Sequence, residues 1–119
     1  MYFSDTYALV EIINDNPSYE KYSKELHICT VLNIFELHQA LLREFNKGTA
    51  DYWLKKFEYE LIEITKEDAI AASHFRFKHK DKKLSSIDCI GYIVALKNNL
   101  KFLTGDKAFQ DIENVEYVK

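Results

Sequence analysis

The chain has 119 residues, of which 47% are hydrophobic and 14% aromatic, a length and composition that fit one packed domain and exclude a disordered chain. The net charge of −3 gives no overall attraction to a polyanion, and no apolar run approaches the roughly 18 residues of a membrane span. The amino terminus begins with strand-like residues rather than a signal peptide. We therefore expect a single domain over residues 1–119 that has no membrane association and a cytoplasmic location.

Short apolar runs alternate with longer helical patterns along the sequence. The runs predict strands at residues 2–5, 26–30, 61–64, 101–104 and 115–118. Helices are predicted at 7–14, from Pro17, at 31–45, at 49–59, from Thr65, at 87–97 and at 107–111, with caps from Thr6, Thr30, Thr49, Thr65, and Ser85 or Ser86. Strands that alternate with helices imply a parallel sheet covered on both faces. We therefore predict a three-layer α/β/α sandwich with a central, mainly parallel sheet of about five strands.

The two cysteines, Cys29 and Cys89, lie inside apolar segments and lack the spacing of a metal site. In a reducing compartment, such positions are typical of small buried hydrophobic side chains. We expect both thiols to be buried and unpaired.

Four carboxylates interrupt apolar elements instead of decorating loops. Asp5 and Asp106 each follow a predicted strand, whereas Glu36 and Asp88 lie in strongly apolar helical patterns. Each has an ordinary explanation when taken singly: a turn or cap acceptor for Asp5 and Asp106, a rim position for Glu36, and helix-start stabilisation for Asp88. Ligands of open parallel sheets bind at the carboxyl ends of strands, near the point where strand order reverses. Taken together, the four acids indicate one acidic cluster at that edge.

Such a cluster requires a cation. Carboxylates within a few ångströms repel one another and raise one another's pKa values unless a metal neutralises them. Ligation by oxygen alone suits Mg²⁺ or Mn²⁺. An ion of this kind can bind a phosphodiester oxygen and activate a water nucleophile. The acids therefore predict metal-assisted chemistry on phosphate esters.

Four segments carry these acids in order. They are residues 3–6 (Phe-Ser-Asp-Thr), 30–37 with Glu36, 84–88 with Asp88, and 102–109 with Asp106. In order and approximate spacing they resemble PIN domains, most closely the small prokaryotic toxins of the VapC type, over nearly the whole chain. The resemblance implies a PIN-like fold and a metal-dependent endoribonuclease that hydrolyses phosphodiester bonds of single-stranded or loop RNA, as the toxin of a toxin–antitoxin pair.

The same resemblance assigns roles to residues. It implies that Asp5, Glu36, Asp88 and Asp106 are both the catalytic residues and the ligands of Mg²⁺ or Mn²⁺. Thr104 and Thr6 would be supporting hydroxyl groups beside this site. It further implies a homodimer and a small cognate antitoxin that covers or enters the acidic cleft.

A second cluster, of opposite charge, precedes Asp88. Residues 74–83 hold five Lys or Arg against one Asp, so this stretch carries +4 and the remainder of the chain −7. The stretch is a local indication of phosphate binding, but charge alone favours the simpler explanation of a solvated helix end that leads into a loop. Phe75 or Phe77 could stack on an unpaired base or belong to the core. The candidate RNA-binding residues are Arg76, Lys78, Lys80, Lys82 and Lys83.

Two other classes of function stay open on the sequence. An RNA-binding or interaction module could use the same fold with a weak or unused metal site. A phosphoryl-transfer receiver or phosphatase also places acids at strand ends, but it requires a Lys and a Ser or Thr after successive strands. Lys107, directly after Asp106, is a poor substitute for that pattern.

Overall fold

The computed structural model describes residues 1–119 and contains one five-stranded sheet in the order β3-β2-β1-β4-β5. Every pair of neighbouring strands is parallel, with registers such as Phe3 opposite Ile28 and Phe102. The strands are β1 (Tyr2–Ser4), β2 (His27–Cys29), β3 (Tyr59–Leu61), β4 (Lys101–Thr104) and β5 (Val115–Tyr117). The predicted α/β class with a parallel sheet of about five strands is therefore confirmed.

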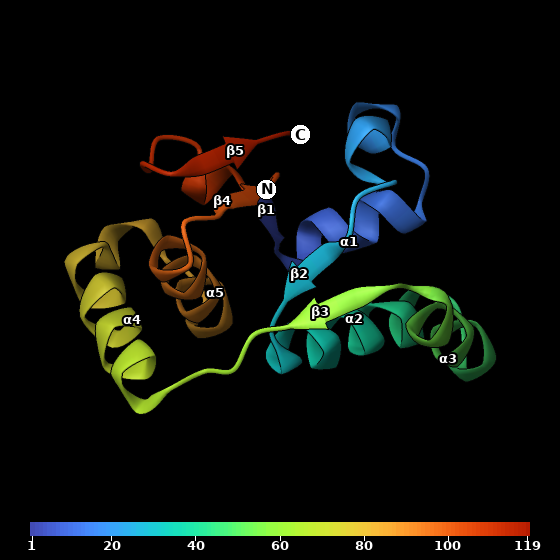
Figure 1. The fold of residues 1–119 in the computed structure, drawn as a ribbon, viewed down its shortest axis with the longest axis horizontal. Helices are drawn as coiled ribbons and strands as arrows, with labels where there is room; N and C mark the ends of the chain where they lie inside the picture. The colour runs from blue at the N-terminus through green and yellow to red at the C-terminus, as the bar shows by residue number, and fades with distance from the viewer.

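Five α-helices and three short 3₁₀ helices surround the sheet. They are α1 (Thr6–Ile13), η1 (Pro17–Tyr22), α2 (Val31–Glu44), α3 (Lys47–Lys56), α4 (Lys66–Lys78), η2 (Lys80–Lys82), α5 (Ser86–Lys97) and η3 (Lys107–Phe109). In Figure 1, α1 and η1 lie on one side of the sheet and α4 and α5 on the other, while α2 and α3 lie beside β2 and β3. None of these helices has the length and apolar character needed to cross a membrane.

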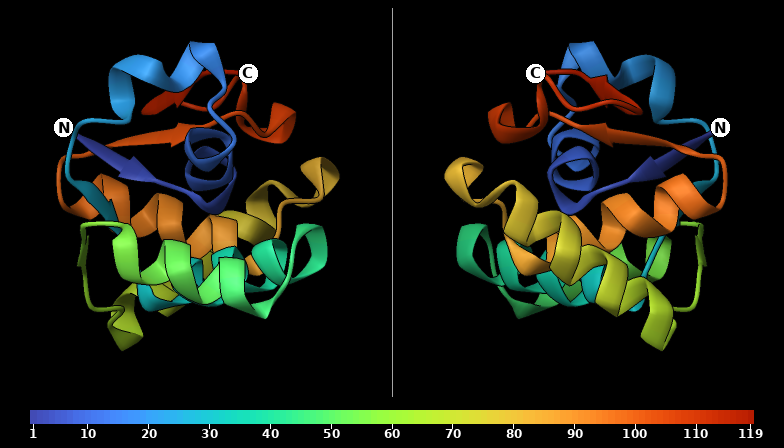
Figure 2. Two further views of the ribbon diagram at one scale, coloured as in Figure 1. Left: turned by 90° about the vertical axis from the view of Figure 1, so that its right-hand side faces the viewer. Right: turned by 90° about the vertical axis from the view of Figure 1, so that its left-hand side faces the viewer.

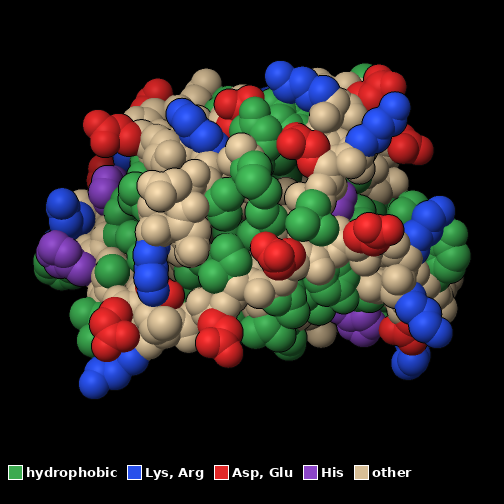
Figure 3. Space-filling model, viewed as in Figure 1, with side chains coloured by type: hydrophobic (Ala, Val, Ile, Leu, Met, Phe, Trp, Pro, Cys, Tyr) green, Lys and Arg blue, Asp and Glu red, His purple; other side chains and the backbone are tan.

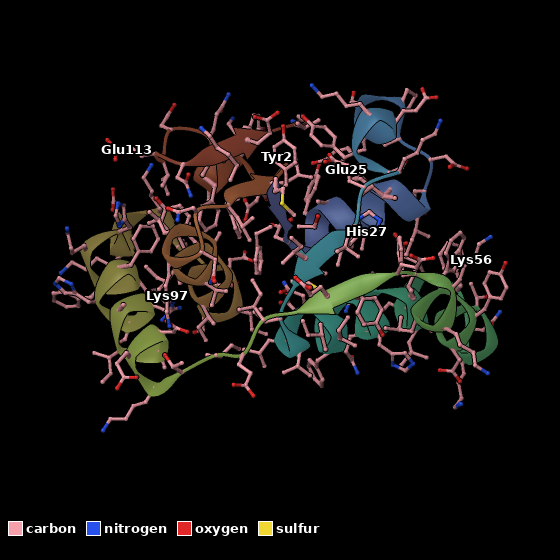
Figure 4. All side chains as sticks on the ribbon, in the orientation of Figure 1. Tyr2, Glu25, His27, Lys56, Lys97 and Glu113 are labelled. Carbon is pink, nitrogen blue, oxygen red and sulfur yellow. The ribbon has the colours of Figure 1, made fainter.

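The centre of the core lies where α5 packs on β1 and β4. The Phe3 and Phe102 rings stack with centroids 5.8 Å apart, and both side chains are fully buried. Gly91 lets α5 approach closely, since a Cβ at this position would lie 3.0 Å from the Phe3 ring. The outer helix α4 is joined to α5 by Lys97, labelled in Figure 4, whose Nζ donates to Asp68 Oδ1 at 3.1 Å. Because α4 shields it, α5 is apolar around most of its circumference.

Some predicted boundaries were wrong, for local reasons. Helix α3 begins at Lys47 because the Asn46 side chain accepts from Thr49 N at 2.8 Å, so Asn46 rather than Thr49 is its cap. Strand β3 lies at the edge of the sheet and ends at Leu61, so only the first residue of the run predicted at 61–64 is in a strand. Helix α1 is capped by Asp5 rather than Thr6.

The two cysteines are buried and form no disulfide, as predicted. Burial raises the pKa of the Cys29 thiol to about 12 and that of Cys89 to about 11. Both side chains therefore stay neutral and serve as small apolar groups near neutral pH.

The strand order reverses between β1 and β4. The chain moves outward from β1 through β2 to β3, and then returns across the sheet to β4 on the other side of β1. Asp5 directly follows β1 and Asp106 lies two residues after β4, so both acids flank this switch point. Figure 2 shows that the start of α1, η3 and the gold segment around residues 79–86 lie at the same end of the molecule. This end is where a doubly wound sheet binds its ligand.

Candidate acidic metal site

Asp5 is the most deeply buried of the four acids, with 1% of its surface exposed. It is the N-cap of α1, where Oδ1 accepts from Ala8 N at 2.9 Å, and its Oδ2 accepts from Thr104 Oγ1 at 2.6 Å. Burial raises the pKa of Asp5 well above its ordinary value, and the negative charges of Asp88 and Asp106 add to this effect against the two hydrogen bonds. The site thus holds a carboxyl group whose ionised form lacks a compensating positive charge.

Asp106 is held at the end of β4 by the same threonine. Its backbone N donates to Thr104 Oγ1 at 3.0 Å, and its Oδ1 accepts from Ala108 N at 3.0 Å as the cap of η3. Thr104 is fully buried. Its single hydroxyl group donates to the Asp5 carboxylate and accepts from the Asp106 backbone, so it links the two acids. Thr104 therefore restrains the carboxylate of Asp5 and the backbone of Asp106.

Glu36 reaches the site from α2 through a chain of hydrogen bonds. Thr6 Oγ1 donates to Glu36 Oε1 at 2.7 Å, and Asn33 Nδ2 donates to Thr6 Oγ1 at 3.3 Å. Asn33 Oδ1 in turn accepts from Thr30 N at 2.9 Å and Thr30 Oγ1 at 3.0 Å. Sequence reasoning missed Asn33, which is 1% exposed. The available signal was a capping-box spacing that ends on a polar residue within an apolar helix.

Asp88 lies in the first turn of α5, where the cap residue Ser85 accepts from Asp88 N at 3.0 Å. Burial raises the pKa of Asp88 to about 6, partly offset by the Ser85 side chain, and the negative charges of Glu36 and Asp106 raise it further. Asp88 is thus an electrostatic neighbour of the acids from α2 and η3. All four predicted acids are linked in this way to one region.

None of the four acids has a basic partner. The ion pairs of the chain join Asp51 to His38 and Lys47, and Asp68 to Lys97, and none of them includes one of these acids. No group of three or more His, Cys, Asp or Glu side chains is arranged so that it could hold a metal ion. Uncompensated carboxylates repel one another, so an open arrangement is expected before a cation binds. The donor set itself, carboxylate and hydroxyl oxygen, fits a hard divalent ion.

The raised pKa of Asp88 predicts an unusual pH dependence of stability without metal. Between pH about 4 and the folded pKa of about 6, folded Asp88 binds a proton more readily than unfolded Asp88 does. The free energy of unfolding should therefore fall as pH rises through this window, by up to about 3 kcal/mol from this group. Urea unfolding in EDTA at pH 4 and pH 7 measures the change for the parent chain and for Asp88→Asn.

The informative quantity is the difference in the free energy of unfolding between the parent chain and Asp88→Asn, because other carboxylates titrate in both proteins. The Asn variant should gain stability relative to the parent as pH rises from 4 to 7. A constant difference over this range would show that the pKa of Asp88 is not raised in the folded protein.

The basic residues occupy the end of α4, η2 and the residue after it, beside the first turn of α5. Arg76 Nε donates to Leu84 O at 2.8 Å, which fixes the loop that leads into α5. Arg76, Lys80 and Lys83 line a cavity between α4 and α5, whereas Lys78 and Lys82 do not. None of the four acids lines this cavity. Three of the five predicted basic residues thus line a cavity that the four acids do not line.

Comparison with known proteins agrees with this architecture. The PIN domain family model matches residues 2–115. No curated protein matches the sequence. The structure is similar to a toxin–antitoxin complex chain from Klebsiella pneumoniae, at 18% identity and a TM-score of 0.74, over 98% of this chain and 96% of that one.

Two further solved structures are similar over their whole length. One is VapBC2 from Rickettsia felis bound to a DNA fragment from its promoter, at 18% identity and a TM-score of 0.75, with 99% and 98% of the two chains covered. The other is VapC20 from Mycobacterium tuberculosis, a toxin that cleaves the sarcin–ricin loop, at 15% identity and a TM-score of 0.80, with 100% of both chains covered. The fold is shared with all three, and because the family model spans nearly the entire sequence, the chain belongs to the PIN domain family.

Proposed function

We propose that this protein is a Mg²⁺- or Mn²⁺-dependent endoribonuclease and the toxin of a toxin–antitoxin pair. The observation that carries the proposal is the set of Asp5, Glu36, Asp88 and Asp106 at the switch point of the sheet, without a basic partner and with the pKa values of Asp5 and Asp88 raised. Family membership and the toxins among the structural neighbours support the same activity.

In this proposal the four acids would hold the divalent ion, and the hydroxyls would orient them. Thr104 restrains the Asp5 carboxylate and the Asp106 backbone, and Thr6 restrains the Glu36 carboxylate. Each carboxylate oxygen has two lone pairs, so an oxygen that accepts one hydrogen bond can still coordinate. When bound, the ion would lower the pKa of a coordinated water and stabilise charge on the leaving oxygen of a phosphodiester.

The basic residues would provide the affinity for RNA that the acids oppose. A net charge of −3 and an acidic site repel a phosphate backbone, whereas Arg76, Lys78, Lys80, Lys82 and Lys83 concentrate positive charge beside it. Contacts from such residues to phosphates position a strand without reading its sequence. We therefore assign these five residues to substrate binding.

We further propose a homodimer that a small antitoxin inhibits. Hydrophobic side chains reach the surface in a band across the middle of the face in Figure 3. Val31 and Phe35 on α2 are 60% and 62% exposed, and their spacing places them on one face of the helix next to Glu36. Apolar surface beside the acidic site suits a protein that covers it. Two of the similar structures are described as toxin–antitoxin assemblies.

The alternative is a PIN-fold module that binds RNA or another protein without cleaving it. The observation that favours it is the lack of side chains already arranged around an ion. This module would use the same basic residues and apolar surfaces.

Cleavage of a fluorogenic single-stranded RNA by the purified chain distinguishes the two. With Mn²⁺ or Mg²⁺ we expect fluorescence to increase, and EDTA should abolish the increase. Asp106→Asn, which keeps a side-chain acceptor for Ala108 N, should be inactive, while Asp111→Asn on the exposed surface should cleave like the parent. Cleavage that EDTA leaves unchanged would refute metal dependence, and no cleavage with either ion would favour the module.

A further inference from the structure

The cavity between α4 and α5 has the size and chemistry of a ligand site. Its volume is about 440 Å³, within the range of small-molecule pockets. Its lining combines an apolar part, including Ala72, Leu84 and Ile90, with the basic groups of Arg76 and Lys80. An unpaired nucleotide has the same division into an apolar aromatic base and a charged phosphate.

The two phenylalanines of α4 have separate roles. Phe75 is half-buried and stacks on Tyr92 with ring centroids 4.6 Å apart, so it belongs to the core. Phe77 is 68% exposed and lines the cavity, and the Nζ of Lys80 lies 5.0 Å from its ring centroid. An exposed aromatic ring that no core contact requires is free to stack on a base. The ammonium group of Lys80 places a positive charge beside this ring.

The cavity is separated from the acidic site by the first turn of α5. Cys89 lines the cavity and directly follows Asp88 in the first turn of α5. A helix with its side chains is about 10–12 Å across, so one extended strand of RNA can pass from one side to the other. The cavity is thus placed to receive a nucleotide close to a phosphodiester at the acids.

We infer that this cavity is a nucleotide-binding subsite for single-stranded RNA, in which Phe77 stacks on an unpaired base and Arg76, Lys80 and Lys83 bind the adjoining phosphates. The inference rests on the proposed function, because it places the substrate of that site. Charge favours RNA over an uncharged ligand, since five of the basic residues of a net acidic chain surround the cavity or adjoin it.

Binding in the absence of metal tests this inference separately from catalysis. Fluorescence anisotropy of a fluorescein-labelled oligouridine octamer in EDTA measures affinity without cleavage. Phe77→Ala should weaken binding about 5- to 150-fold, the range expected for the loss of one base–aromatic stack. Ile70→Ala is the matched control, since Ile70 is 61% exposed on the same helix and does not line the cavity. It should bind like the parent.

Two lysine variants test the phosphate contacts of the proposed subsite in the same way. Lys80→Ala should reduce the slope of log affinity against log salt concentration by about 0.7, as expected for one lost phosphate contact on a single strand. Lys66→Ala removes an exposed lysine at the opposite end of α4 and should leave the slope unchanged. Equal losses for Phe77→Ala and Ile70→Ala, or equal slopes for the two lysine variants, would overturn the inference. Retained cleavage with no effect of Phe77→Ala on octamer binding would refute the subsite while the nuclease proposal stands.

Discussion

Replacing Asp5 with asparagine is expected to abolish RNA cleavage and leave the fold intact. Asparagine is as good an N-cap as aspartate, so Ala8 N keeps its acceptor, and the side chain still meets Thr104. The variant loses a negatively charged ligand from the centre of the acidic site. Loss of an outer partner of a metal site typically costs 10- to 100-fold, so the loss of a ligand should cost on the order of 10³-fold or more.

The same substitution should not reduce the stability of the protein without metal. Burial opposes the ionised form of Asp5, so removing its charge relieves an unfavourable term in the folded state. Cleavage rates with Mn²⁺ and urea unfolding in EDTA are the two measurements, with Asp111→Asn as the control for the same chemical change at the surface. An Asp5→Asn protein that cleaves at the parental rate would remove Asp5 from the site. One that unfolds would assign it a structural role.

A second large effect, on the free energy of unfolding, is expected from substitution of Gly105, which lies between Thr104 and Asp106. A Cβ at this position would lie 2.2 Å from Tyr7 Cε1 and 2.5 Å from the backbone oxygen of Val118. Val118 cannot retreat easily, because its N donates to Thr104 O at 2.9 Å and its carbonyl oxygen accepts from the Tyr19 hydroxyl. Gly105→Ala should therefore cost about 3 kcal/mol or more in the free energy of unfolding, at or above the upper end for overpacking.

Gly48→Ala supplies the matched control, since its nearest neighbour is Asn46 Oδ1 at 3.4 Å and the residue lies in α3. Alanine in a helix is favoured over glycine by up to about 1 kcal/mol, so this variant should be as stable as the parent or more stable. Urea midpoints for the three proteins give both values. A Gly105→Ala protein with parental stability would contradict the close approach of Val118, just after β5, to the loop that carries Asp106.

Sequence patterns were sufficient to predict the α/β fold with its parallel sheet and the positions of Asp5 and Asp106 after strands. Alternation of strands and helices determined the parallel sheet, and the positions of Asp5 and Asp106 after strands placed them at one edge. The ends of helices were harder to predict from the sequence. A capping residue such as Asn46 competes with nearby candidates, and only the folded backbone selects one of them.

Features that depend on contacts between distant segments could not be predicted from the sequence. Asn33 supports Glu36 only through Thr6, which comes from another helix, so the capping-box spacing marks Asn33 as part of the cap of α2 but does not reveal its contact with the acidic site. The separation of Phe75 from Phe77 into core and cavity depends on how α4 packs against Tyr92 of α5. Likewise, charge alone could not show that Arg76, Lys80 and Lys83 line a cavity whereas Lys78 and Lys82 do not.

The central claim is that Asp5, Glu36, Asp88 and Asp106 together hold one divalent metal centre. A calorimetric titration of the purified chain with Mn²⁺ at pH 7.5, above the raised pKa of Asp88 of about 6, tests it most directly. We predict saturable binding to the parent chain and to Asp111→Asn, and none to a folded Asp5→Asn/Asp106→Asn double variant. Saturable binding of equal affinity by the double variant, or no binding by the parent chain, would contradict the account.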